Sequence, residues 1–400
     1  MPELLNDPRV IAFIAEHEND NVSELLLKSK FIFGVPAPVI ADQITGRRKA
    51  KGKLPLFYSD HSTIYPLAIH IEQCSSDQTA RFKSDLVMEA TGTDPVSLGL
   101  DLTGGMGVDS LFLCKQFRQF HYVEPDNYLL EVARHNLERH ARNIIFHNST
   151  AEEFIRTTRM NFDLVYIDPS RRTSGNKKVV GLDECVPDVI TLQQDIFRVS
   201  NRLLIKTSPL LDIRKGLSDL KSAKRVIVVS VANECREVLF FCERGFHGDP
   251  DIMAVDINNA RTENFRFTLK DENEAVSEFG EPSVFLYEPN ASIRKAGAFK
   301  LIGTRFAVNK LHINTHLYSS RDLKENFPGR IFRIIAPIKA RKEDIATFFP
   351  DKKANVITRN YPLSPEELKK KTGLKDGGER YLFGFTSLKG KSLVVAERVA

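Results

Sequence analysis

Short apolar runs alternate with helical patterns through the middle of the chain, from about residue 96 to residue 244. Helical patterns separate most of the runs; between residues 126 and 142, for example, Leu129, Ala133 and Leu137 recur on one helix face. The runs lie at residues 96–101, 120–124, 144–146, 162–168, 203–206, 226–229 and 238–241. Strands that alternate with helices predict βαβ units, and therefore an α/β fold with a Rossmann-like, doubly wound, mainly parallel sheet.

The last two runs of this region are close together in sequence. A short link at residues 233–235 separates them, which leaves no room for the crossover helix that parallel neighbours need. We therefore expect these two strands to pair antiparallel, so that the sheet ends in a hairpin.

The segments on either side of the alternating region have other patterns. Near the N-terminus, Asp7 and Pro8 start one predicted helix, and Asn21 offers a second start before a run of leucines. After residue 245 strand-like pieces precede a helix expected over 291–297, and a β-rich segment follows from about residue 330, so we expect a C-terminal α+β module. The expected domains are 1–90 (helical), 91–245, 246–325 and 326–400.

Composition and charge narrow the class of protein. Of the 400 residues, 42% are hydrophobic and 27% are charged, which excludes a fibrous or wholly disordered chain. The net charge of +5 is unevenly spread, because residues 301–400 hold 20 Lys and Arg against 10 Asp and Glu, while the rest sums to −5. This segregation indicates an acidic partner such as nucleic acid for the C-terminal quarter, and a solvated lysine-rich surface is the other interpretation.

A second basic stretch lies near the N-terminus. Residues 46–53 read GRRKAKGK, with five cations and two glycines in eight residues. We expect a mobile loop there, which either contacts phosphates or forms a solvated turn.

Cysteine spacing and the first residues bear on the compartment. The five cysteines lie far apart with no CxxC pair, which predicts neither a disulfide framework nor a zinc site. The N-terminus carries acid where a secretory signal needs basic residues, and no apolar run reaches about 18 residues. We therefore expect a cytoplasmic protein that does not span a membrane, with no metal site; the sequence leaves the oligomeric state open.

Candidate functional residues stand where the predicted strands end, because open parallel sheets bind ligands at that edge. The first strand runs into a glycine turn, DLTGGMG at residues 101–107, followed by a helix. Glycines let the backbone approach a ligand closely, and the helix start presents free N–H groups. Asp101 stands at the tip of this strand, and Glu124 ends the second strand.

The glycine turn does not match a dinucleotide fingerprint. The third glycine of GxGxxG would fall at position 110, which is Ser110. Asp101 repels a pyrophosphate but suits an ammonium group, and Glu124, 17 residues past Gly107, can accept both hydroxyls of a ribose. A cofactor with a ribose and a cationic amino-acid end, and without phosphate, fits both acids. S-adenosylmethionine has these parts.

Residues 91–245 resemble the class I S-adenosylmethionine-dependent methyltransferases. The resemblance rests on the glycine turn, on Glu124 as the ribose acid and on the sequence DPSRR at residues 168–172. The whole chain is similar to a bacterial group that adds a ferredoxin-like segment, here 246–325, and a C-terminal THUMP-like domain, here 326–400. The tail sequences at 355–361 and 375–378 carry the second likeness. THUMP domains are associated with binding structured RNA, especially tRNA.

The resemblance implies roles for individual residues. Asp101 would face the methionine amino group, and Glu124 would hold the ribose. Thr150, with Ala151, falls where the family often places an acid for the adenine amino group, and its hydroxyl would accept that bond instead. The other residues that would line the cofactor are Thr103, Gly104, Gly105, Gly107 and Pro125.

Asp168, Pro169, Ser170 and Arg171 resemble the (Asp/Asn)-Pro-Pro-aromatic motif of enzymes that methylate amino groups of bases. In that chemistry the acid and a following carbonyl accept hydrogen bonds from the amino group and aim its lone pair at the methyl carbon. The aromatic residue is absent here, and Arg171 would stack on a base or contact a phosphate. Another interpretation is that Asp168 only caps a turn.

Methylation at C5 of a pyrimidine would require a cysteine nucleophile. The fifth strand ends in KTSP at residues 206–209 without one, and we interpret Cys74 and Cys185 as structural thiols. The sequence thus predicts a methyltransferase that uses S-adenosylmethionine and acts on RNA, either tRNA or rRNA, at an exocyclic base nitrogen. The alternatives are a small-molecule or protein methyltransferase and a non-catalytic RNA-binding protein that keeps the fold.

Overall fold

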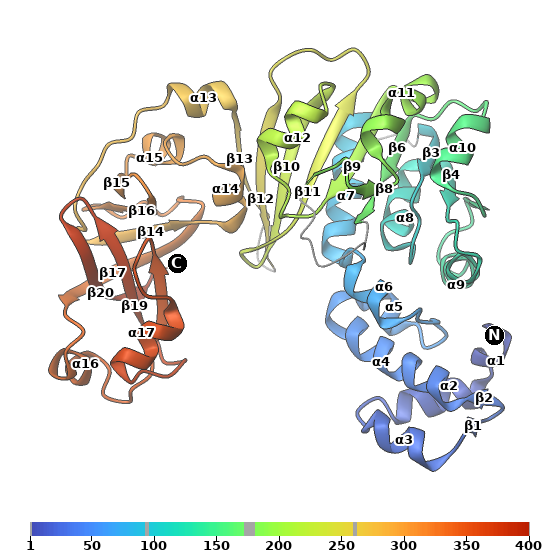
Figure 1. Ribbon diagram of the computed structural model, residues 1–400, viewed down its shortest axis with the longest axis horizontal. Helices are drawn as coiled ribbons and strands as arrows, with labels where there is room; N and C mark the ends of the chain where they lie inside the picture. The colour runs from blue at the N-terminus through green and yellow to red at the C-terminus, as the bar shows by residue number, and fades with distance from the viewer. Residues whose placement is uncertain (1, 93–95, 172–180, 259–261, 400) are drawn as a thin grey trace. The chain divides into compact units, whose positions relative to one another are not determined.

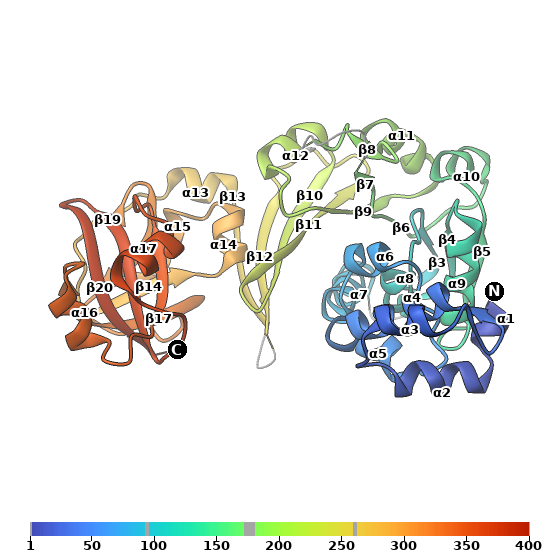
Figure 2. The same ribbon diagram turned by 60° about the horizontal axis from the view of Figure 1, so that its bottom comes forward.

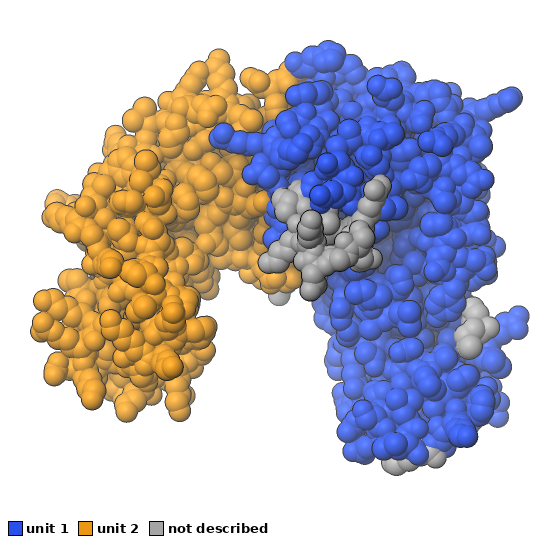
Figure 3. Space-filling model, viewed as in Figure 1, with its two compact units in different colours: residues 1–224, 238–247 blue, residues 225–237, 248–400 orange. Residues whose placement is uncertain are grey.

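The computed structural model describes residues 2–92, 96–171, 181–258 and 262–399. The chain forms two compact units, which Figure 3 distinguishes by colour. Unit 1 comprises residues 1–224 and 238–247, and unit 2 comprises residues 225–237 and 248–400. In the part of the chain that is described, no helix is both long enough and apolar enough to cross a membrane.

Unit 1 begins with a series of helices (Figure 1). As predicted, the side chains of Asp7 and Asn21 cap the N-termini of the second and third of these helices. The elements are α1 (Pro2–Leu5), α2 (Pro8–Glu16), α3 (Val22–Lys28), β1 (Phe31–Ile32), β2 (Val35–Pro36), α4 (Ala37–Lys53), α5 (Pro55–Ser59), α6 (Ala68–Gln73) and α7 (Asp77–Thr91).

The basic stretch at residues 46–53 is not a mobile loop, so that prediction is wrong. It forms the last part of α4, where a Cβ on Gly46 would come within 2.4 Å of the Tyr65 Cβ. Its cations have partners: Arg47 is buried and donates to Glu18, and Lys53 donates to the carbonyls of Ile71 and Glu72. Arg48, Lys49 and Lys51 likewise contact Glu18, Asp20 or Glu72. The helix is stable here because the charges are paired within unit 1.

A nine-stranded sheet follows, in the order β13-β12-β10-β11-β9-β6-β3-β4-β5. Strands β5, β4, β3, β6 and β9 run parallel to one another, and β11 is antiparallel to β9. The bounds are β3 (Val96–Asp101), β4 (Phe117–Val123), β5 (Ile144–His147), β6 (Leu164–Ile167), β9 (Arg202–Thr207), β10 (Ala223–Val231), β11 (Glu234–Glu243), β12 (Asp251–Ile257) and β13 (Thr262–Thr268). The predicted fold class, a mainly parallel Rossmann-like sheet, is confirmed.

Strands β10 and β11 are neighbours in the sheet, as the predicted hairpin requires. The prediction that the sheet ends with these two strands is wrong, because β12 pairs parallel with β10 and β13 pairs antiparallel with β12. The remaining elements of this region are α8 (Val108–Leu113), the 3-10 helix η1 (Cys114–Gln116), α9 (Asn127–Leu137), α10 (Ala151–Thr157), β7 (Ser170–Arg171), β8 (Cys185–Val186), α11 (Val189–Val199) and α12 (Ile213–Asp219).

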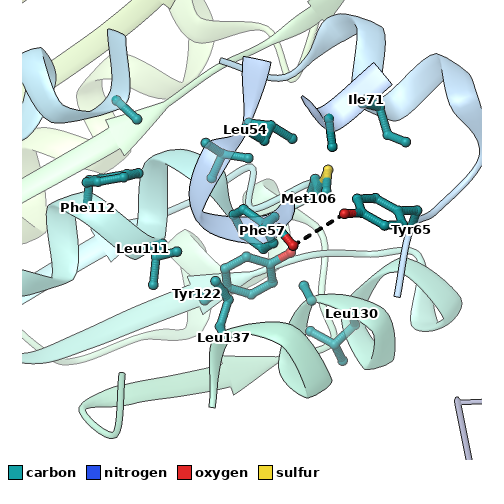
Figure 4. Close-up of a cluster of buried hydrophobic side chains, with 14 residues drawn as sticks. Leu54, Phe57, Tyr65, Ile71, Met106, Leu111, Phe112, Tyr122, Leu130 and Leu137 are labelled. Carbon is teal, nitrogen blue, oxygen red and sulfur yellow. Dashed lines mark hydrogen bonds between the residues drawn. The ribbon is translucent and has the colours of Figure 1, made fainter. Parts of the chain in front are cut away.

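The N-terminal helices and the sheet share one hydrophobic core (Figure 4). Leu54 and Phe57 from α4–α5 pack in the same cluster as Met106 of the glycine turn, Phe112 of α8 and Tyr122 of β4. The Tyr65 hydroxyl donates to the Phe57 carbonyl at 3.3 Å within this cluster. The helices therefore support the turn that holds the candidate site.

Unit 2 contains a second sheet of seven strands, in the order β15-β16-β14-β17-β20-β19-β18. Successive residues of β19 enter different clusters: Phe383 packs with Phe332, whereas Leu382 packs with Leu368 of α17. Figure 2 shows the ribbon of α17 beside the strands of this sheet. The predicted helix at 291–297 is confirmed as α14. The elements are α13 (Leu269–Glu274), β14 (Phe285–Pro289), α14 (Ala291–Ala296), α15 (Leu301–Phe306), β15 (Asn309–His312), β16 (Thr315–Ser320), β17 (Gly329–Ile338), α16 (Lys342–Phe348), β18 (Asn355–Arg359), α17 (Pro365–Thr372), β19 (Arg380–Ser387) and β20 (Gly390–Arg398).

Candidate active site

Three acidic residues lie at the carboxyl ends of three adjacent strands. Asp101 ends β3, whose register places it opposite Tyr122 of β4 on one side and Tyr166 of β6 on the other. Glu124 and Asp168 each follow two residues after those tyrosines. The structure therefore brings together the three acids that the sequence singled out.

The glycine turn between β3 and α8 lies directly against Tyr122. The Gly104 amide donates to the Val123 carbonyl at 2.9 Å, and a Cβ on Gly104 would lie 2.1 Å from the Tyr122 ring. The Tyr122 hydroxyl donates to the Gly105 carbonyl at 2.5 Å. Residue 104 must be glycine because the buried ring occupies the space of any side chain.

The other two glycines of the turn occupy their positions for different reasons. Gly107 has φ +82°, and a Cβ there would meet Leu137 of α9 at 2.6 Å, so this glycine lets the helices pack. Gly105 has φ +59°, but the nearest atom to its missing Cβ is the Thr103 carbonyl oxygen at 3.8 Å. Gly105 alone of the three faces open space, where a bound molecule can approach the backbone.

Glu124 is 8% exposed and is held by the turn itself. One carboxylate oxygen accepts from the Gly105 amide at 2.9 Å, and the other accepts from the Asp126 amide at 3.0 Å. Burial raises the pKa of Glu124, although both amides act in the other direction. Each oxygen retains a lone pair, so the carboxylate can accept two further hydrogen bonds from a ligand.

Asp101 is almost completely buried. It accepts hydrogen bonds from the Thr103 amide at 2.9 Å and from the Ser110 hydroxyl. Burial raises the pKa of Asp101 to about 7, and the negative charges of Asp109 and Asp168 act in the same direction. A cation would favour the charged form of this carboxylate, because it would offset the cost of burying the negative charge.

Thr103 joins Asp101 to the residue that follows the neighbouring strand β6. Its hydroxyl accepts from the Asp168 amide at 2.7 Å and lies 3.4 Å from an Asp101 oxygen. Asp168 is in turn paired with Lys206, since its Oδ2 lies 2.5 Å from the lysine Nζ. Sequence reasoning missed the role of Lys206, and its position at the end of β9 was the signal that could have found it.

The residues after Asp168 are only partly described. Pro169 is buried, and the exposed Ser170 donates to the Val186 carbonyl at 3.2 Å. The backbone of Arg171 pairs with Cys185 as strands β7 and β8. The side chain of Arg171 lies outside what the structure describes, so its expected contact with a base or a phosphate stays a prediction.

Thr150, Ala151 and Pro125 lie along the ends of β4 and β5. The Thr150 hydroxyl accepts from the Glu153 amide at 3.1 Å and so caps α10, whose first residue is the buried Ala151. Asn148, which sequence reasoning missed, donates at 3.0 Å to the carbonyls of both Glu124 and the exposed Pro125. Capping uses one of the two acceptor positions of this hydroxyl and leaves the other. The adenine role expected for Thr150 stays a prediction.

A buried ionic network supports the helix after the glycine turn. Asp109 of α8 accepts from Ser75 and Tyr166 at 2.7 Å each, and it pairs with the fully buried Lys83 of α7 at 3.1 Å. Burial alone would raise the pKa of Asp109, but the charges of Lys83 and Lys206 hold it below its ordinary value. This network fixes α7 of the N-terminal segment to the helix that starts beside the site.

Cys74 and a polar depression on the surface are two further features that do not contribute to the group of three acids. Burial raises the pKa of the Cys74 thiol to about 11, which disfavours the thiolate that a nucleophile needs. A polar depression of about 440 Å³ lies where β6 and β9 begin, at the opposite ends of the strands from the three acids. It is lined by Phe162, Asp163, Asn201, Arg202, Glu243 and Arg244.

The Thr103 hydroxyl gives a local prediction. In Thr103→Val the Asp168 amide loses its acceptor, whereas Thr103→Ser keeps it. Losing a hydrogen bond worth about 1 kcal/mol should speed local amide exchange by roughly five- to tenfold. Hydrogen exchange of a peptide that contains Asp168 measures this, and equal exchange in the valine and serine variants would contradict the contact.

Comparisons with known proteins bear on the fold as a whole. A solved structure from Porphyromonas gingivalis W83, described as a candidate methyltransferase, is 27% identical to this chain. The match covers 98% of each chain, with a TM-score of 0.86. Family models match residues 285–328 as a ferredoxin-like domain and residues 329–398 as a THUMP-like domain. No curated protein matches the sequence.

Shorter solved proteins match part of the chain. M. capricolum TrmK in complex with S-adenosylhomocysteine is 12% identical over 42% of this chain and 70% of its own, with a TM-score of 0.32. An rRNA methylase from Streptococcus thermophilus is 14% identical over 40% of this chain and 93% of its own, with a TM-score of 0.30. At these scores neither match decides the substrate. The full-length match and the family models confirm the predicted resemblance: the chain has a methyltransferase fold, followed by ferredoxin-like and THUMP-like domains.

Proposed function

We propose that this protein uses S-adenosylmethionine to methylate RNA, either tRNA or rRNA, at an exocyclic nitrogen of a base. The observation that carries the proposal is the group of three acids around one glycine turn, at the ends of β3, β4 and β6. S-adenosylmethionine would supply a methyl group on a positively charged sulfur. The residues described below would bind it and orient the acceptor.

The residues present fit this cofactor. Gly105 leaves open the space that a Cβ would fill, and Glu124 beside it has acceptor positions for two ribose hydroxyls. Asp101, buried and without a cationic partner among the described residues, suits the amino group of the methionine part. These complementary charges support S-adenosylmethionine over a neutral or anionic ligand at the same edge.

The same residues argue against a dinucleotide. Ser110 stands where the fingerprint has its third glycine, and its hydroxyl is fully buried in a bond to Asp101. A pyrophosphate at this turn would lie near the buried Asp101 carboxylate and be repelled by it. The site therefore favours a cofactor without phosphate.

Asp168 would position the methyl acceptor. Lys206 fixes its Oδ2, which leaves Oδ1 to accept a hydrogen bond from a base amino group, together with the Pro169 carbonyl. An amino nitrogen conjugated to a base is a poor nucleophile because its lone pair is delocalised, and two such bonds would hold it pyramidal towards the methyl group. Positioning of this kind supplies much of the rate enhancement in transfer reactions.

RNA as the substrate is supported by the C-terminal part of the chain. The THUMP-like match covers residues 329–398, within the quarter that carries a charge of +10. A positive region of this kind favours binding to a phosphate backbone. The expected cytoplasmic location stays a prediction, and so does the choice between tRNA and rRNA.

The proposal is tested by methyl transfer. The purified chain, incubated with radiolabelled S-adenosylmethionine and RNA from a strain lacking the gene, should label tRNA or rRNA, and digestion to nucleosides should place the label on an exocyclic nitrogen. Label in protein or small molecules instead would contradict RNA as the substrate. RNA binding without any transfer would favour a non-catalytic RNA-binding protein.

Asp168 gives the sharpest prediction about mechanism. Because its contact to the acceptor matters mainly in the transition state, Asp168→Ala should lower turnover by about 10²- to 10³-fold with little change in cofactor affinity. Asp168→Asn should be milder, since an amide oxygen still accepts one bond.

A matched control is Asp163→Asn, at the other end of the same strand, where the side chain accepts from the Leu98 amide. Its turnover should stay near that of the unchanged protein. Turnover of Asp168→Ala within about threefold of the unchanged protein would show that Asp168 has only a structural role.

A further inference from the structure

Three arginines of unit 2 surround a single buried carboxylate. Glu288 of β14 is fully buried, and Arg330 and Arg359 donate to its two oxygens from their Nε atoms at 2.9 and 2.8 Å. Both arginines make a second bond through Nη2, and Arg294 of α14 adds a contact at 3.4 Å. We call Arg294, Arg330 and Arg359 the arginine cluster.

The arginine cluster joins the two small domains. Glu288 and Arg294 belong to the ferredoxin-like match, whereas Arg330 and Arg359 belong to the THUMP-like match. Strand β14 pairs with β17, in register Glu288 opposite Arg330, and Arg359 comes from β18. The cluster therefore exists only where the two domains share their sheet.

The charges in the cluster do not cancel. Three guanidinium groups face one carboxylate, which leaves two positive charges at a position where the arginine side chains are still 25–29% exposed. Burial foremost, and then the charges of Arg359 and Arg330, lower the pKa of Arg294 although Glu288 opposes this. One carboxylate neutralises one of the three guanidinium groups, so the excess positive charge can attract an anion.

Two buried side-chain nitrogens lie close to the arginine cluster. The Nε of Arg294 is buried without a hydrogen-bond partner among the described residues, and so is the Nδ1 of His316. His316 stacks on Phe299 with ring centroids 3.7 Å apart. Burial, followed by the positive charges of Lys310, Arg294 and Arg359, lowers the pKa of His316 to about 4, so this ring is neutral at pH 7 and lies in the positive field of the arginines.

We propose that the arginine cluster binds a phosphate group of the RNA substrate. Each guanidinium carries five N–H donors, and Glu288 takes one from Nε and one from Nη2 of both Arg330 and Arg359, which holds these two groups in fixed orientations. Nη1 of Arg359 donates to the Thr358 carbonyl at 2.8 Å, so the remaining N–H groups, those of Arg330 Nη1 foremost, are the ones that would donate to a phosphate. The identity of the RNA rests on the proposed function. The chemistry of the site, an anion held by preoriented arginines, does not depend on methyl transfer.

The test uses the full chain, a fluorescently labelled tRNA transcript and no cofactor. Arg359→Gln should weaken binding by about tenfold and should lower the slope of log affinity against log salt by about one, since one phosphate contact is lost. Arg330→Gln should weaken binding and lower the salt slope in the same way. It replaces Arg359→Gln if thermal unfolding shows that the Arg359 variant does not fold.

Arg380→Gln is the matched control. Arg380 lies in the same sheet and pairs with Glu397 at 3.2 Å, but it does not contact Glu288. Its affinity and salt slope should stay near those of the unchanged protein. Equal losses in the Arg359 and Arg380 variants would overturn the proposal, because they would show only a general effect of charge.

A second arm separates RNA from free phosphate. Inorganic phosphate, titrated into the same proteins, should bind weakly, and Arg359→Gln should abolish that binding. Tight phosphate binding without any RNA binding would overturn the assignment to RNA. Because no cofactor is present, a failure of methyl transfer would contradict the proposed function and leave this readout intact.

Discussion

The contact between Gly104 and the ring of Tyr122 determines the geometry of the site. Since a Cβ at residue 104 would lie 2.1 Å from the ring, the turn can lie on β4 only with glycine there. The Tyr122 hydroxyl then holds the Gly105 carbonyl, and the Gly105 amide holds Glu124. One close approach therefore places Gly105, Glu124 and the end of β4 in a fixed arrangement.

A second chain of contacts connects the proposed cofactor acid to the proposed acceptor acid. Asp101, Thr103, Asp168 and Lys206 follow one another through hydrogen bonds or ion pairs, across β3, β6 and β9. Because each group is held by the next, the distance between the proposed cofactor acid and the proposed acceptor acid is set by the sheet and not by a flexible loop. This rigidity is what a transfer reaction requires of its active site.

Much of the fold follows from local patterns, and the rest depends on partners far apart in sequence. The alternating runs predicted β3, β4, β6 and β9, and capping residues such as Asp7 predicted helix starts, because both signals are local. The pairing of Asp168 with Lys206 joins residues 38 apart, and Glu18 neutralises Arg47 from 29 residues away. The cations at residues 46–53 therefore predicted a loop, because their acidic partners are too far away in sequence to be identified from the pattern.

The most direct measurement is a calorimetric titration of the protein with S-adenosylmethionine at pH 6 and pH 7.5, with NAD as the comparison ligand. Because burial raises the pKa of Asp101 to about 7, the carboxyl must lose its proton to bind the amino group, which stays largely protonated in this range. Affinity should therefore rise by roughly five- to tenfold from pH 6 to pH 7.5, with release of a proton. Binding of NAD with no binding of S-adenosylmethionine, or an affinity that does not rise with pH, would contradict the account.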